Sequence, residues 1–167
     1  MDVDMGWFLK ARCMRSPVIL AFAAMIASVT PGGAADVWQK ISDPENNLSV
    51  EYPASVFRNF AGPTDRYAGK RFLTPDGQAE FAYYAFENRL RETPAKYLNR
   101  TLVVQKSNLV YKRITDRFFV ISSVRNKRIF YSRCNFGSTV KCIYLEYPAS
   151  EKRAWDRAVA RISSSLR

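Results

Sequence analysis

Residues 118–147 read FFVISSVRNKRIFYSRCNFGSTVKCIYLEY, and this stretch decides the fold. Apolar and polar side chains alternate along it with the period of two that is typical of a β-strand with one buried face. The dipeptides Asp116-Arg117 and Asn126-Lys127 are tight-turn sequences, and such short connections join antiparallel strands. The sequence therefore predicts an antiparallel meander whose strands are residues 109–114, 118–124, 128–135 and 140–147.

The segment after the meander has the periodicity of an amphipathic helix. Ser150 supplies a side-chain oxygen that could cap the helix N-terminus. The apolar stripe is Trp155, Ala158, Val159, Ile162 and Leu166, and the basic residues Lys152, Arg153, Arg157 and Arg161 lie on the other side. Because a helix with one apolar stripe must bury it, we expect this helix to pack on the sheet.

Before the meander, the sequence predicts a hairpin and a second helix. Residues 70–74 and 79–86 flank Pro75-Asp76-Gly77, which is a strong turn signal. Thr93-Pro94 is the sequence of a helix start, because threonine caps the N-terminus and proline occupies the first helical position. We expect this helix to place Leu102 on its apolar face and to end at residues 106–108.

The expected fold class is α+β. Residues 37–41 and 48–52 are further short strands, and residues 57–69 are expected to be a loop. The hairpin and the meander form an antiparallel sheet, and one face of it is covered by the mid-chain helix and the C-terminal amphipathic helix.

The first 35 residues have the three parts of a secretory signal peptide. A basic segment around Arg12 precedes an uncharged apolar run of 13 residues, 17–29, and small residues follow it. Such a run forms a helix of ~20 Å, which is too short for the ~30 Å hydrocarbon core of a membrane anchor. We therefore predict a periplasmic or secreted protein, with a signal peptide over residues 1–35, a single domain over residues 36–167 and no transmembrane segment after cleavage.

Export leaves two cysteines, because Cys13 belongs to the signal peptide. Disulfides persist outside the cytoplasm. The alternation of the last two strands places Cys134 and Cys142 on the same face, where they can meet across the hairpin. We predict a Cys134–Cys142 disulfide.

The chain is strongly basic and contains no histidine. It carries 26 Lys and Arg against 15 Asp and Glu, and removal of residues 1–35 changes the net charge only from +11 to +10. A Ser-His-Asp triad, a Cys-His pair and a zinc site with a histidine ligand are excluded. We predict no catalytic residues, no metal and no cofactor, and export argues against a nucleic-acid partner.

A small hydrolase that uses loop carboxylates is the alternative function. A glycosidase needs only two carboxyl groups at a defined separation. Solvated turn residues are the ordinary interpretation of such carboxylates, and the glutamates at positions 51, 80 and 146 alternate with apolar neighbours as outward-facing strand residues do. The loop candidates are Asp43, Glu45, Asp65, Asp76, Glu87 and Glu92.

The basic residues of the meander are interleaved with aromatic ones, a combination that holds phosphates and stacks rings. The turn brings Arg125 and Arg128 together, and alternation places Arg113 beside Tyr111 and Arg133 beside Tyr131. A solvated rim that maintains solubility is the alternative interpretation. The predicted anion site consists of Arg113, Arg125, Lys127, Arg128 and Arg133.

Several segments resemble known exported proteins. The sequences LSVEYP at 48–53, LEYP at 145–148 and ISSSL at 162–166 resemble small exported proteins of the PsbP/DcrB-like type. More closely, ETPA at 92–95 and IFYSRCN at 129–135 resemble exported alpha-proteobacterial proteins that have not been characterised. The resemblance implies a non-catalytic α/β sandwich and transfers no functional residue, and no histidine here could match a metal site reported for the PsbP type.

Together these features predict an exported, non-enzymatic binding or accessory module of the cell envelope. Its expected partner is an anionic envelope component or another protein. Lipid head groups, lipopolysaccharide phosphates and acidic polysaccharides are the anionic components that long-range attraction to a +10 domain would favour.

Overall fold

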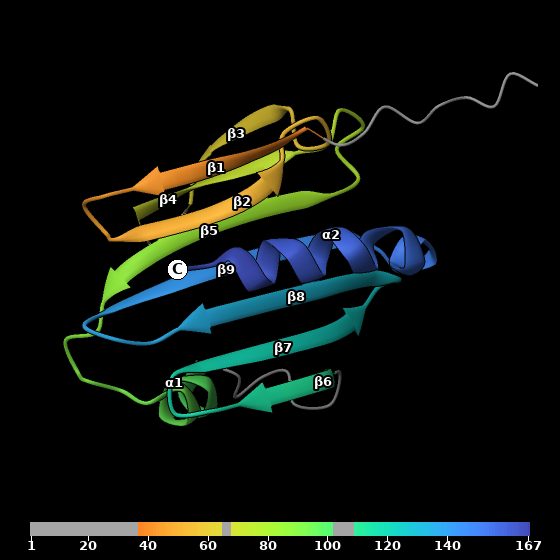
Figure 1. Cartoon of the computed structure of the whole chain (residues 1–167). Helices are drawn as coiled ribbons and strands as arrows, with labels where there is room; N and C mark the ends of the chain where they lie inside the picture. The colour runs from red at the N-terminus through yellow and green to blue at the C-terminus, as the bar shows by residue number, and fades with distance from the viewer. Residues whose placement is uncertain (1–36, 65–67, 102–108) are drawn as a thin grey trace, which may run out of the picture. The chain divides into compact units, whose positions relative to one another are not determined.

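The computed structural model describes residues 37–64, 68–101 and 109–167. Their strands form two antiparallel sheets (Figure 1). The small sheet pairs β1 (Trp38–Asp43) with β2 (Leu48–Pro53). The large sheet has seven strands in the order β3-β4-β5-β9-β8-β7-β6. These strands are β3 (Asn59–Pro63), β4 (Ala68–Leu73), β5 (Glu80–Glu87), β6 (Leu109–Ile114), β7 (Phe118–Arg125), β8 (Arg128–Asn135) and β9 (Thr139–Pro148).

Two α-helices accompany the sheets. They are α1 (Pro94–Thr101) and α2 (Lys152–Ser165). The predicted α+β class, the hairpin β4–β5 and the antiparallel meander β6–β9 are confirmed. The C-terminal helix lies against β2 and β9, so its predicted packing on the sheet is also confirmed (Figure 1).

The two helices lie on opposite faces of the large sheet, and the expectation that both cover one face is wrong. Ile162 of α2 shares a buried core with Ile143 of β9 and with the apolar side chains of β2. Leu98 of α1 belongs to a second core, which contains Cys142. Because successive residues of a strand point to opposite faces, β9 contributes to both cores and separates the helices.

The expectation of a loop over residues 57–69 is also wrong, because Asn59–Pro63 forms the edge strand β3. Gly62 has a backbone φ of 99°, which side chains rarely allow, and the register with β4 shifts between Phe60 and Gly62. The glycine that suggested a loop therefore allows a bulge in an edge strand. Residues 65–67 of the predicted loop lie outside the described residues.

The helix starts differ from each other. The oxygen Oγ1 of Thr93 accepts a hydrogen bond from the backbone N–H of Lys96 at 3.3 Å, so the predicted cap of α1 is confirmed. The prediction of a Ser150 cap is wrong, because a 3₁₀ turn (Ala149–Glu151) leads into α2 and no side chain caps it. The expected extension of α1 through Leu102 to residue 108 lies outside the described residues, as does the predicted signal peptide at 1–35.

The predicted disulfide is confirmed. Cys134 and Cys142 are directly opposite each other on β8 and β9, with Cα atoms 4.1 Å apart, and their sulfurs are bonded. Both side chains are buried in the core that α1 covers.

Candidate functional site

Four of the five residues of the predicted anion site lie on opposite faces of the large sheet, and the fifth, Lys127, lies in the turn between β7 and β8. On the face that carries α2, Arg113 of β6 and Arg133 of β8 flank Val120 of β7 in register. Arg125 and Arg128 pair with each other across the turn between β7 and β8, on the other face. The structure therefore brings together two separate pairs of arginines, which no single small anion can contact.

Arg125 and Arg128, on the other face, already interact with other groups of the protein. Arg128 donates to the carboxylate of Glu146 and, at 2.8 Å, to the backbone oxygen of Gln78. The guanidinium carbon of Arg125 lies 5.0 Å from the centre of the Phe130 ring. Lys127 occupies the turn with a φ of 60°. Because Arg128 has a carboxylate partner, this pair gains less from a second anion than an unpaired arginine would.

The other two arginines share one aromatic ring. The guanidinium carbon of Arg133 lies 4.7 Å and that of Arg113 lies 5.5 Å from the centre of the Phe118 ring. In the described part of the chain, neither arginine forms an ion pair with a carboxylate. We refer to these two residues as the Arg113–Arg133 pair.

Arg133 is held in place by its neighbours. Its Nε donates to Oδ1 of Asn135 at 3.0 Å, and one terminal nitrogen donates to the backbone oxygen of Ser163 at 3.0 Å. Ser163 lies near the C-terminal end of α2, where backbone carbonyls lack helical partners and attract cations. The helix end thus orients the guanidinium without neutralising it.

Electrostatics around Arg133 are unfavourable for a cation. Partial burial lowers the pKa of Arg133; Tyr131 opposes this shift, and the positive charges of Arg167 and Arg113 add to it. Arginine nevertheless remains protonated in proteins. Arg133 therefore keeps its positive charge, and the unfavourable free energy of that charge at this position is not offset by a carboxylate. A bound anion would relieve it.

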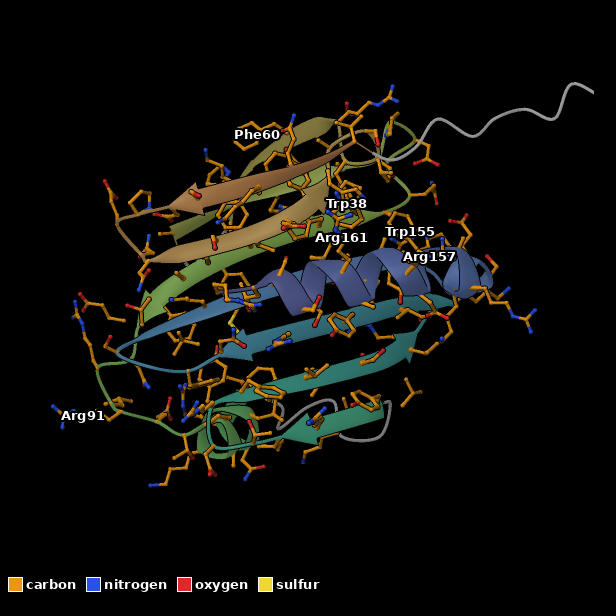
Figure 2. The ribbon with its side chains drawn as sticks, viewed as in Figure 1. Trp38, Phe60, Arg91, Trp155, Arg157 and Arg161 are labelled. Carbon is orange, nitrogen blue, oxygen red and sulfur yellow. A yellow bond between two sulfur atoms is a disulfide. The ribbon has the colours of Figure 1, made fainter. Side chains whose placement is uncertain are left out.

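A second group of cations was not predicted as a site. Arg153, Arg157 and Arg161 follow one another at every fourth residue of α2, and they line a hollow of about 330 Å³ together with Trp38. The guanidinium carbon of Arg161 lies 4.1 Å from the centre of the Trp38 ring. Figure 2 labels both residues beside α2. The regular spacing was visible in the sequence, but nothing local indicated that β1 would supply the aromatic ring. We refer to the three arginines as the α2 arginine row.

The loop carboxylates of the hydrolase alternative make ion pairs or turn contacts. Glu87 and Glu92 line a hollow of about 760 Å³, but each is bonded to an arginine, at 2.8 Å from Arg89 and 2.6 Å from Arg100. The hydrogen bond from Arg100 lowers the pKa of Glu92. A glycosidase acid needs a raised pKa, so the pKa of Glu92 is shifted in the wrong direction for that role.

The remaining loop candidates have local roles. Asp43 accepts hydrogen bonds from the backbone and side chain of Asn46 in the β1–β2 turn. The hydroxyl of Thr74 donates to Asp76 and lowers the pKa of that carboxyl. Asp65 lies outside the described residues. These contacts are those of turn residues, and Glu45 is an exposed residue of the β1–β2 turn.

No family model matches the chain, and no curated protein matches it. Among solved structures, the chain is similar to the solution structure of cyanobacterial PsbP (CyanoP) from Synechocystis sp. PCC 6803. The TM-score is 0.58 and the identity 13%, and the match covers 85% of this chain and 98% of the other. The fold of the described residues is therefore PsbP-like, as the sequence resemblance implied. The likeness to DcrB and to alpha-proteobacterial proteins stays a prediction.

Two absences hold within the residues that the structure describes. Neither of their helices is long and apolar enough to cross a bilayer. Their acidic and cysteine side chains form no group of three that could hold a metal ion.

Proposed function

We propose that this protein is an exported, non-catalytic binding or accessory module of the cell envelope, which recognises an anionic component through the Arg113–Arg133 pair. One observation carries the proposal: two guanidinium groups lie over the single ring of Phe118, and no carboxylate of the described residues pairs with them.

The chemistry of the pair suits an oxyanion. A guanidinium presents several N–H donors in a planar fork that matches carboxylate and phosphate groups. Asn135 and Ser163 use part of the fork of Arg133 and fix its direction, so little side-chain freedom is lost on binding. The ring of Phe118 makes a cation–π contact with each of the two guanidinium groups, which favours both cations at this position.

The cellular setting follows from the predicted signal peptide. Export to the periplasm or the medium would expose the basic domain to lipid head groups, lipopolysaccharide phosphates and acidic polysaccharides. We expect mass spectrometry of protein recovered from the exporting organism to find a chain that begins near Asp36. An intact Met1 terminus in the soluble fraction would contradict export with cleavage.

The binding test compares two charge reversals, Arg113→Glu and Arg125→Glu. Both arginines are exposed and lie over a phenylalanine ring, but they are on opposite faces of the large sheet. Each substitution changes the net charge by the same amount, so the comparison isolates the position of the charge. The probes are lipopolysaccharide and the soluble acidic polysaccharide alginate, titrated at ~0.1 M and ~1 M salt, where the Debye length falls from about 10 Å to about 3 Å.

We expect wild type to bind at least one probe at low salt and to lose binding at high salt. Arg113→Glu should weaken binding by about tenfold or more, whereas Arg125→Glu should change it by less than about threefold. Equal effects of the two variants, or no binding of either probe at low salt, would mean that the pair is only a solvated basic surface. Salt-sensitive capture of an acidic protein in place of both probes would favour the protein-partner alternative.

A further inference from the structure

We infer that the α2 arginine row and Trp38 form a docking surface for an anionic phospholipid bilayer. The inference rests on the location in the cell envelope that the proposed function includes, and it adds a second anion-binding surface to the one proposed there. It uses residues on the outer side of α2 and in β1, and not the Arg113–Arg133 pair, so the two proposals can fail separately.

The helix presents its arginines away from the sheet. Val159 and Ile162 are buried in the core beneath α2, and the row lies on the other side of the helix. One flank of α2 is tied to β2, because Oγ of Ser165 accepts a hydrogen bond from the backbone N–H of Glu51 at 2.8 Å. The other flank is tied to β8 through the hydroxyl of Tyr131, which donates to Oγ of Ser163 at 2.6 Å. The helix therefore forms a fixed ridge on this face.

The ridge carries more cations than the protein itself neutralises. Asp156 is the one carboxylate within α2, and it pairs with Lys152 at 2.8 Å. Arg161 pairs with Glu51 at 2.9 Å. Arg153 and Arg157 have no ion pair among the described residues. The positive charge that no carboxylate balances is therefore carried by Arg153 and Arg157, at the N-terminal end of the row.

Trp38 adds an amphipathic ring beside these cations. It borders the hollow of about 330 Å³, whose lining between the arginines consists of Ala154 and Ala158. A tryptophan side chain combines an apolar ring with a polar N–H group, and such side chains favour the head-group level of a membrane. Val37, next in the chain, is 58% exposed and extends the apolar edge. An arginine ridge bordered by tryptophan has the side-chain composition of an interfacial surface.

The distribution of charge along α2 favours a bilayer surface as the ligand over a small anion. Successive arginines of the row are one helical turn apart, and the row extends over about 12 Å along the axis. A single phosphate could contact only part of such a line. A bilayer offers many phosphates in one plane, and each basic residue held near it contributes roughly a fivefold gain in association.

The experiment uses the chain from residue 36 to 167 and vesicles of phosphatidylcholine with or without phosphatidylglycerol. A background substitution, Trp155→Phe, leaves Trp38 as the one tryptophan of residues 36–167, so that its emission reports the environment of the proposed surface. The test variant is Arg153→Glu with Arg157→Glu. The matched control is Arg125→Glu with Lys127→Glu, which makes the same change of charge at the end of β7 and in the β7–β8 turn, away from the α2 arginine row.

We expect phosphatidylglycerol vesicles, and not pure phosphatidylcholine, to shift the Trp38 emission to shorter wavelength at low salt. The test variant should bind about 25-fold more weakly or worse, and the control less than about threefold more weakly. Equal weakening of both variants, an unshifted emission, or binding that needs an envelope protein in place of vesicles would overturn the inference.

Measuring the binding of each variant to each probe distinguishes the two proposals. If Arg113→Glu loses alginate or lipopolysaccharide while the α2 variant binds vesicles like wild type, the bilayer inference fails and the proposed function stands. If the α2 variant loses vesicles while Arg113→Glu binds every probe like wild type, the Arg113–Arg133 pair is not the site and the bilayer inference stands.

Discussion

Glu80 of β5 and Glu146 of β9 lie directly opposite each other in the sheet, and each is bonded to an arginine. Like charges at opposed positions destabilise a sheet. Arg71 donates to Glu80 at 3.0 and 3.2 Å, and Arg128 donates to Glu146, which also accepts a hydrogen bond from the hydroxyl of Tyr144 at 2.8 Å. The two cations therefore allow the two carboxylates to be neighbours in the middle of the sheet.

Replacing Arg128 by alanine should destabilise the fold. The substitution leaves the half-buried carboxylate of Glu146 beside Glu80 without its cation, and we expect the free energy of unfolding to fall by about 1–3 kcal/mol in urea titrations. Adding Glu80→Gln should restore part of the loss, because it removes the opposing charge. The control is Arg89→Ala, whose ion pair with Glu87 is exposed, so its loss should leave the free energy of unfolding nearly unchanged. Equal losses for Arg128→Ala and Arg89→Ala would contradict this account.

The Cys134–Cys142 disulfide should stabilise the domain chiefly through the unfolded state. It joins residues eight positions apart, and closing so short a loop contributes roughly 2.5 kcal/mol in the chain-entropy model. Urea unfolding of wild type with and without reductant measures this contribution. In the double variant Cys134→Ala, Cys142→Ala the reductant should have no effect. A wild-type stability that reductant leaves unchanged after full reduction in the unfolded state would refute the prediction.

Lys127→Gly should stabilise the protein. Asn126 and Lys127 have φ angles of 50° and 60°, the left-handed conformation that a two-residue hairpin turn of this type requires. Glycine adopts it without the steric cost that lysine bears, so we expect a gain of up to about 1 kcal/mol in the free energy of unfolding. Lys127→Ala keeps the side-chain clash and should show no gain. A loss of stability in the glycine variant would show that the lysine side chain contributes in another way.

Stability should fall in alkaline solution because of buried tyrosines. Burial raises the pKa of Tyr147 to about 12, and Asp156 and Tyr131 contribute to the shift. The unfolded chain releases this proton near pH ~10, so the folded state holds more protons between these values and its stability decreases as pH rises. The contribution is fully present below pH ~10 and is lost by pH ~12.

Urea midpoints measured over this pH range test the prediction about Tyr147. The variant Tyr147→Phe keeps the ring and removes the ionisable hydroxyl, so its stability should decline less steeply. Tyr144 and Tyr131, whose pKa values burial also raises, should account for the remaining slope. A variant with the same slope as wild type would show that Tyr147 does not carry the effect.

Features that depend on neighbouring residues were determined by the sequence alone. Period-two alternation and two-residue turns specify the meander, and the same alternation places Cys134 opposite Cys142. The apolar stripe of α2 specifies a helix on a sheet. These signals are local because a strand or helix repeats its geometry every few residues, whatever the rest of the chain does.

The tertiary structure alone decided which surfaces these elements share. The face covered by α1 depends on which apolar side of the sheet Leu98 packs against, and the division of the predicted cations depends on which side of its strand each one occupies. Trp38 meets Arg161 across more than a hundred residues of sequence. No local pattern encodes such contacts, because they are selected by the packing of two distant apolar faces, and the side chains at the margin of that packing come together as its consequence.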